Sequence, residues 1–285
     1  MSHRSDSAGG GLYPEEWSRP TAFRNRWVRL GVYLSVLAFF VYSIWEIRVT
    51  PDRLLVGIEG ARTLLSSMFP PDFGLSFEGG GISVERNAEL IRTGVVESLG
   101  MSVVATVVGV LVSVPIAFMA AENMVPRPVY YVGRVVVSVS RAFHVLVVAI
   151  IAVVAVGFGP LAGTLAMVFS TPGFFAKLLA EDLEDIDRTE LDAIRSTGAS
   201  RTQVILYGVV PQVLPRVIGL TIYRWDINIR AATIIGIVGA GGIGSTLYSS
   251  FQRYEYDFSL AIVLVIVAIV MVGEGVSAYA RRRVQ

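Results

Sequence analysis

Four polar residues lie close together inside an otherwise apolar stretch, in the run YRWDINIR. Arg224, Asp226 and Arg230 carry charge, and Asn228 lies between them. Guanidinium groups donate paired hydrogen bonds to the oxygens of carboxylates and phosphorus oxyanions. A helix places residues four apart on one face, so Asp226 can meet Arg230 and Arg224 can meet Asn228. The run predicts either an ion pair that fixes a helix bundle or a set of cationic donors for an anionic ligand.

A glycine-rich run, IIGIVGAGGIG, follows these charges. Gly239, Gly241 and Gly244 match the G-x-G-x-x-G pattern of dinucleotide-binding folds, and Asp257 lies near the position of the ribose-binding acid. That fold requires further strands and helical crossovers, but only 41 residues follow Gly244 and a 21-residue apolar run takes up half of them. We therefore reject a dinucleotide site. With Gly242, these glycines instead predict an irregular, closely packed backbone at a gate, enclosed by protein or water.

The composition places these residues in a lipid bilayer. The 285 residues are 53% hydrophobic and only 16% charged, which is far more apolar than a soluble domain. Cysteine is absent, which excludes disulfides, cysteine-bound zinc and thiol nucleophiles, and His3 and His144 are too few for a histidine-rich metal site. The net charge of +1 gives no indication of nucleic acid binding. We expect neither a metal nor a cofactor in this chain, and no catalytic residue.

Apolar runs long enough to cross a bilayer occur six times, since a spanning helix needs about 20 residues. The first apolar run follows several arginines, and we interpret it as a membrane anchor and not as a cleaved signal peptide. Basic residues predict that both termini are cytoplasmic, because the outer connections would hold only Arg48, Arg53, Arg62, Arg86, Arg92 and Arg253, and the cluster Arg281 to Arg283 would lie inside. The expected spans are residues 28–47, 96–120, 135–157, 160–179, 214–239 and 259–279.

One connection between spans, residues 189 to 215, is polar and carries helix signals. Thr189 followed by Asp192 resembles a capping box, and Gly198 can adopt the left-handed turn that ends a helix. Ser200 with Gln203 forms a second capping box, after which Pro211 and Pro215 would interrupt or end the second helix. We expect two short helices below the membrane, bent at Gly198, unless the segment is an ordinary solvated loop. Their predicted outward-facing residues are Glu190, Asp192, Ile194, Arg195 and Arg201.

The spacing within this connection resembles the "EAA" loop of ATP-binding-cassette (ABC) importer permeases. The family pattern is Glu-Ala-Ala, three residues, Gly, nine residues, Ile, any residue, Leu, Pro. The present chain keeps Ala193, Gly198 and Pro211 at this spacing, with Asp192 in place of Glu, and departs from the pattern at residues 194, 208 and 210. In that family the loop couples the permease to its ATPase. The resemblance assigns coupling to Glu190, Asp192, Ala193, Gly198, Ala199, Arg201 and Pro211.

The run YRWDINIRAATIIGIVGAGGIG, together with SSMFPPDF and GVVPQVLP, is similar to the permease of phosphonate importers. The resemblance spans roughly residues 60 to 280 and implies an all-α integral membrane protein with the type I (MetI-like) permease fold. It also implies a homodimer or a pair with a second permease, two ATPase subunits that bind ATP and Mg, and an extracytoplasmic solute-binding protein. The expected cargo is phosphonate, phosphite or a phosphate ester. Methionine import and ATP-independent secondary transport are the alternatives.

These expectations divide the chain into a cytoplasmic tail at 1–27, a first span with an outer loop at 28–94, a permease core at 95–280 and a basic tail at 281–285. The coupling loop would occupy 181–212. The outer loop has apolar residues at helical spacing, which predicts an amphipathic helix either on the membrane surface or packed on the bundle.

Other polar residues near the span ends have simpler interpretations. Arg141 and His144 would snorkel to the inner interface from the third span, and Glu97 and Glu274 would be interfacial. Pro115 would kink the second span, where small residues permit close helix packing.

Overall fold

The computed structural model describes residues 25–48, 50–78, 81–84 and 86–284. The chain divides into two units, residues 1–62 and 63–285, which we describe separately. Most of the predicted tail at 1–27 lies outside the described residues.

The first unit consists of α1 (Arg26–Glu46) and most of α2 (Pro51–Met68). Asn25 caps α1 by accepting a hydrogen bond from the backbone N–H of Trp27 at 3.0 Å. No residue of α1 is buried within the chain, and large apolar side chains such as Phe39 and Trp45 are exposed all around it. This apolar surface on every side is typical of a helix that faces lipid. α2 occupies the segment in which the sequence predicted a helix after the first span, and its apolar side chains Leu55 and Ile58 are also exposed.

The second unit is a helix bundle that begins with a small hairpin. Strands β1 (Leu75–Glu78) and β2 (Gly81–Val84) pair antiparallel, with Leu75 opposite Val84, and were not predicted from the sequence. The remaining elements are α3 (Arg86–Ala120), α4 (Arg127–Ala142), α5 (Val145–Val156), α6 (Pro160–Glu184), α7 (Arg188–Ser196), α8 (Arg201–Val204), the π-helical turn Ile205–Val209, α9 (Val210–Ile234), the 3₁₀ turn Ile235–Val238, α10 (Ile243–Gln252) and α11 (Tyr256–Val284).

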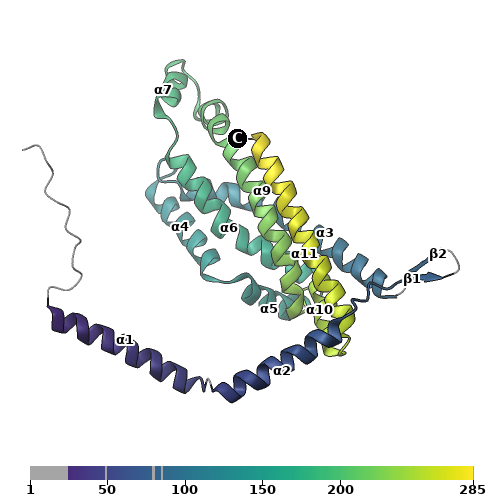
Figure 1. Ribbon diagram of the computed structural model, residues 1–285. Helices are drawn as coiled ribbons and strands as arrows, with labels where there is room; N and C mark the ends of the chain where they lie inside the picture. Colours follow the sequence, from purple (N-terminus) through teal and green to yellow (C-terminus); the bar gives the residue numbers. More distant parts are fainter. Residues whose placement is uncertain (1–24, 49, 79–80, 85, 285) are drawn as a thin grey trace, which may run out of the picture. The chain divides into compact units, whose positions relative to one another are not determined.

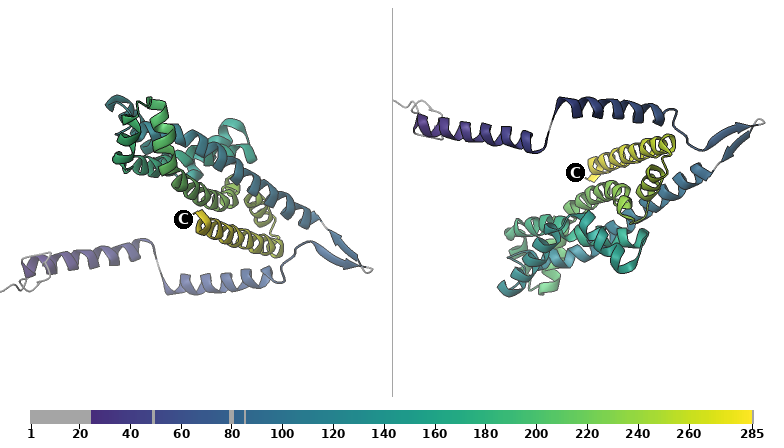
Figure 2. Two further views of the ribbon diagram at one scale, coloured as in Figure 1. Left: turned by 90° about the horizontal axis from the view of Figure 1, so that it is seen from above. Right: turned by 90° about the horizontal axis from the view of Figure 1, so that it is seen from below.

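Small residues allow the central helices to approach one another closely. α3 packs most extensively on α6, and both also contact α9. The α3 residues at this contact include Ala105 and Gly109, and α6 contributes Ala162, Gly163 and Ala166, all of which are buried. Close packing through small side chains replaces the hydrophobic driving force that lipid cannot supply. Figures 1 and 2 show the bundle from three directions, with α7 at one end and α5 and α10 toward the other.

The described helices confirm the all-helical fold, with five or six candidate membrane spans. Five helices of the described residues are long and apolar enough to cross a bilayer, and α4 with α5, a pair bent by 90°, makes a sixth if the pair forms one broken span. The sequence predicted one uninterrupted span over residues 135–157, and the prediction of a continuous helix there was wrong. Phe143 adopts an extended backbone between the two helices, and His144 caps α5 by accepting from the N–H of Leu146 at 3.3 Å.

Two prolines, expected to interrupt or end the helix after Gly198, do not end it, although a π-helical turn precedes the first of them. Pro211 lies in the first turn of α9, where a missing N–H costs little, and α9 continues through Pro215 to Ile234. The π-helical turn accommodates this start, because the Val210 N–H donates to the carbonyl of Ile205, five residues back. The segment around Gly198 is therefore continuous with a spanning helix.

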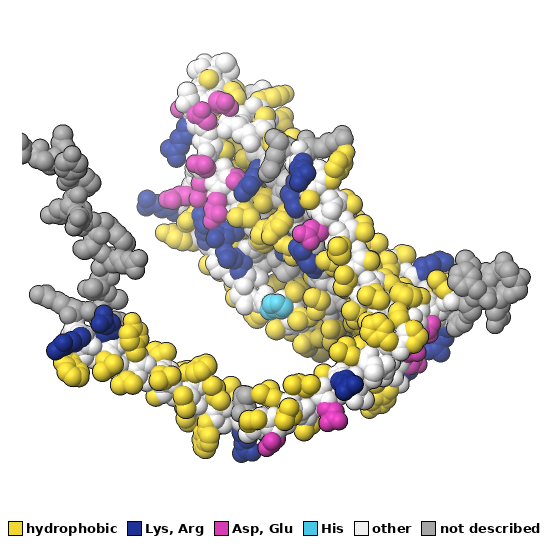
Figure 3. Space-filling view, in the orientation of Figure 1, with side chains coloured by type: hydrophobic (Ala, Val, Ile, Leu, Met, Phe, Trp, Pro, Cys, Tyr) yellow, Lys and Arg dark blue, Asp and Glu magenta, His cyan; other side chains and the backbone are white. Residues whose placement is uncertain are grey.

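Charged side chains of the second unit gather at the α7 end, and apolar side chains cover its middle (Figure 3). α11 packs along α9 and returns the chain to the end at which α9 begins (Figure 1). The C-terminal end of α11 and the α7–α8 segment thus lie at the same end of the bundle.

Candidate functional site

The α7–α8 segment has the two-helix form expected from the sequence. Asp187, two residues before the expected cap, accepts a hydrogen bond from the Thr189 N–H at 2.8 Å and begins α7, so the predicted cap at Thr189 was wrong. Gly198 has a φ of +80° and ends this helix. Ser200 and Gln203 form the predicted capping box that begins α8.

Most of the residues assigned to this segment face solvent, and its apolar residues hold it on the bundle. Glu190, Asp192 and Ala193 are exposed, as is Pro211 at the start of α9. Ile194, expected to point outward, is instead half-buried against the core that contains Leu191 and Val204, because the α7 face with Leu191 is the apolar one. Ala199 packs on the same core. The segment therefore presents a polar outer surface on a fixed apolar base.

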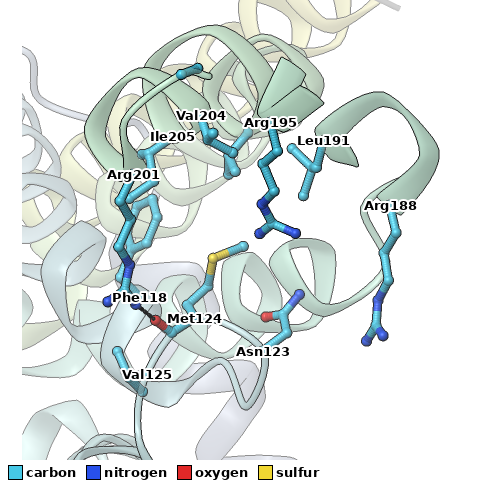
Figure 4. A pocket seen from close by; sticks show the side chains of 12 residues that line it. Phe118, Asn123, Met124, Val125, Arg188, Leu191, Arg195, Arg201, Val204 and Ile205 are labelled. Carbon is cyan, nitrogen blue, oxygen red and sulfur yellow. Dashed lines mark hydrogen bonds between the residues drawn. The ribbon is translucent and has the colours of Figure 1, made fainter. Parts of the chain in front are cut away.

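Arginines surround a cavity of about 820 Å³ behind this segment (Figure 4). Arg188 and Arg195 reach toward it from α7, and Arg201 closes its other side by donating from Nη2 to the Met124 carbonyl at 2.9 Å. Arg195 also pairs with Asp192 at 3.0 Å, but both side chains are well exposed, so this pair contributes little to stability. The bond from Arg201 ties α8 to the α3–α4 connection.

The four polar residues of α9 separate into three different contacts. Asp226 is buried and pairs with Arg230 one turn later, as predicted. Arg224 does not meet Asn228. It donates from Nε to Thr171 Oγ1 at 3.2 Å and from Nη2 to Ser170 Oγ at 2.6 Å, both on α6.

Asn228 turns the other way, toward α3. Its Nδ2 donates to Thr106 Oγ1 at 2.9 Å, and the residue is fully buried. α9 thus presents Arg224 to α6 and Asn228 to α3. The two side chains form hydrogen bonds with polar groups on different neighbouring helices. Side-chain hydrogen bonds of this kind hold helices together where water is absent.

The glycine run forms a turn that is hydrogen-bonded to two other parts of the chain. Gly239, Gly241 and Gly242 have positive φ, while Gly244 lies in α10, a helix not expected from the sequence. The Gly242 N–H donates to Glu97 Oε2 at 3.1 Å, so Glu97 binds the start of α10 and is not merely interfacial. On the other side, the Gly239 carbonyl accepts a hydrogen bond of 3.0 Å from the Gly159 N–H.

Gly241→Ala is expected to destabilise the protein, because Gly241 has a φ of +80° and an added Cβ would lie 2.5 Å from the backbone nitrogen of Pro160. Backbone strain of this kind costs about 1 to 3 kcal/mol. The midpoint of thermal unfolding of the detergent-purified protein should fall by several degrees. Gly275→Ala is the control, because no atom lies within 4 Å of its added Cβ. Equal midpoints for the two variants would contradict the close packing of Gly241 against Pro160.

Comparison with known proteins agrees with this architecture. The family described as binding-protein-dependent transport system inner membrane component matches residues 113–285. The phosphite transport system permease protein PtxC of Stutzerimonas stutzeri is 36% identical over 81% of this chain and 80% of its own length. The phosphate-import permease protein PhnE of Mycolicibacterium smegmatis is 33% identical over 84% of this chain and 43% of its own length.

Among solved structures, an inward-facing MetNI methionine ABC transporter matches with a TM-score of 0.60 at 20% identity, covering 70% of this chain and 97% of that chain. At this identity the likeness supports the fold alone. The helix bundle and the match over most of its length show that this chain is a member of the family of inner membrane components of binding-protein-dependent transport systems.

Proposed function

We propose that the chain is the permease subunit of an ATP-driven importer for phosphite, phosphonate or a related phosphorus oxyanion. The observation that carries this proposal is the match to PtxC, named as a phosphite permease, across four fifths of both chains. The methionine transporter shares the fold at only 20% identity, which gives no support to methionine as cargo. The chain itself performs no covalent chemistry under this proposal.

The α7–α8 segment is the proposed contact with the ATPase. Its support is the exposed polar surface around Asp192, the turn at Gly198 and the continuity of α8 with the spanning helix α9. A push on α7 would reach α9 directly. Two ATPase subunits, which would bind ATP and Mg, dock at this end, and both termini of the permease are cytoplasmic.

The opposite end of the bundle receives the extracytoplasmic binding protein. A second copy of this chain, or a second permease, completes the path, and closure of the ATPases tilts the two bundles so that the path opens outward. The glycine turn at 239–244 is the proposed gate. Arg224 and Arg230 present positive charge to the path, and Asp226 and Asn228 hold α9 in place. The proposed division of the chain is that expected from the sequence, with the permease core at 95–280.

Reconstitution of the permease with its ATPase and binding protein in proteoliposomes tests this function. We expect phosphite to accumulate inside only when ATP and the binding protein are supplied on the appropriate sides. Calorimetry of the binding protein with methylphosphonate, phosphite, phosphate and methionine then identifies the cargo. Accumulation without ATP would indicate a secondary transporter, and binding of methionine alone would exclude the oxyanion assignment.

A further inference from the structure

A cavity of about 540 Å³ lies where the α4–α5 break meets α6 and α9. Basic side chains from all three regions line it: Arg141 and His144 at the break, Lys177 on α6 and Arg224 on α9. None of its lining residues is acidic. The volume is typical of small-molecule sites. Positive charge gathered from distant parts of the chain indicates an anionic ligand.

Arg141 and His144, the two basic residues at the break, have hydrogen-bond donors available for a ligand. Arg141 makes no hydrogen bond or ion pair with any residue in the described part of the chain, and its side-chain stem lies against Gly173, where an added Cβ would be 2.7 Å from Arg141 Cγ. The His144 ring accepts a hydrogen bond at Nδ1 from the Leu146 N–H. A neutral ring with this bond carries its hydrogen on Nε2, which is then a donor.

The other two basic residues are partly engaged. Arg224 is buried and uses Nε and Nη2 in its bonds to α6, while its Nη1 makes no hydrogen bond within the described residues. Lys177 pairs with Glu181 at 3.4 Å on the same helix. An unpaired cation at membrane depth costs about 2.5 to 3.5 kcal/mol, and in such segments it generally serves a function.

Ser140 fixes the geometry of the break. Its hydroxyl donates to the Phe169 carbonyl at 2.7 Å and accepts from the Gly173 N–H at 2.9 Å, so it bridges two backbone groups of α6 next to Pro172. A side chain that enters a helix ladder in this way holds the two helices in one register. Arg141, the next residue of α4, is therefore held beside the cavity by this tertiary contact as well as by its own helix.

We propose that this cavity is an oxyanion site within the permease itself, which takes a tetrahedral phosphorus oxyanion during its passage; this inference rests on the proposed function. Arg141 and Arg224 supply guanidinium donors suited to paired phosphorus-bound oxygens, and His144 supplies a single donor. A lipid phosphate offers the same chemistry. The transported anion is favoured because Arg224, which lines the cavity, lies near the middle of the spanning helix α9 and not at its ends, where lipid headgroups lie.

The test uses the complete importer in proteoliposomes and compares Arg141→Gln with Arg127→Gln. Arg127 is an exposed residue at the start of the same helix, makes no hydrogen bond or ion pair with described residues and does not line the cavity. We expect Arg141→Gln to lower phosphite transported per ATP hydrolysed at least tenfold, with the thermal midpoint unchanged. His144→Gln should lower it less, and Arg141→Lys should restore part of it. Arg127→Gln should behave as the wild type.

Unchanged transport by Arg141→Gln would overturn the site while leaving the proposed function intact, because the wild type in the same assay still imports phosphite. Failure of the wild type to import any phosphorus oxyanion would overturn both. A second measurement separates the two sources of phosphate: ³¹P NMR of phosphite added to the permease–ATPase complex in nanodiscs, without the binding protein. We expect phosphite binding that Arg141→Gln abolishes. Phosphatidylglycerol retained only by the wild type, with no phosphite binding, would identify a lipid site and overturn the proposal.

Discussion

Gly198→Val is expected to abolish transport by the reconstituted importer, with a loss of more than tenfold, while the protein still inserts and folds. Gly198 has a φ of +80°, and no atom lies within 4 Å of an added Cβ, so the substitution acts through the backbone alone. A β-branched residue is strained in this region by about 1 to 3 kcal/mol, and the turn between α7 and α8 must rearrange. The measurement is ATPase activity stimulated by the loaded binding protein, together with uptake.

Gly198→Asn is the matched control, because asparagine tolerates the left-handed conformation far better than valine. We expect this variant to retain most of the stimulated ATPase activity. If Gly198→Val transports as well as Gly198→Asn, the turn plays no part in coupling. In a protein that transports without an ATPase, neither substitution would lower transport.

Asp226→Asn is expected to give the largest loss of stability among the changes considered. Asp226 is 6% exposed at its side chain and pairs with Arg230, which is 41% exposed. Loss of the carboxylate leaves a guanidinium without its counterion inside a spanning helix, at a cost of about 2 to 3 kcal/mol. The thermal midpoint of the purified protein should fall by about 5 °C or more.

The double variant Asp226→Asn with Arg230→Gln separates a structural role from a role on the path. Removal of both charges should bring the midpoint back to within a few degrees of the wild type, since neither position then carries an unpaired charge. Uptake should nevertheless stay low if Arg230 presents its charge to the anion. Full uptake by the double variant would show that the pair serves only the structure. Arg253→Ala, which breaks a partly exposed pair with Glu255 outside this run, serves as the control and should change the midpoint little.

Several features of this protein were predictable because their signals are local. Apolar run length predicted the spanning helices, and the i, i+4 spacing predicted the pair between Asp226 and Arg230. Ser200 with Gln203 and a glycine at 198 predicted a helix start and a helix end, since caps depend on residues within one turn. The family resemblance in the loop and in the glycine run also depended on contiguous residues and fixed spacings, which are local features of the sequence.

Local signals could not predict the features that depend on distant partners. The run 134–156 contains neither glycine nor proline, so nothing in it indicated the 90° break after Ala142. Tertiary contacts accompany that break, and the Ser140 bonds span 29 and 33 residues. The same limit applied to Pro211, which was expected to interrupt or end a helix but is accommodated by a π-helical turn.

The sequence by itself determined that this is a membrane bundle with a polar two-helix segment and a charged, glycine-rich spanning helix. Only the tertiary structure decided which neighbours those polar groups meet. Arg224 binds hydroxyl groups that lie more than 50 residues earlier on α6, and Asn228 binds Thr106 on α3. Helical periodicity specifies the face on which a side chain lies, but hydrogen-bond partners depend on which helix packs against that face. For this reason the cavity at the α4–α5 break, with basic residues from three separate regions, became visible only in the folded chain.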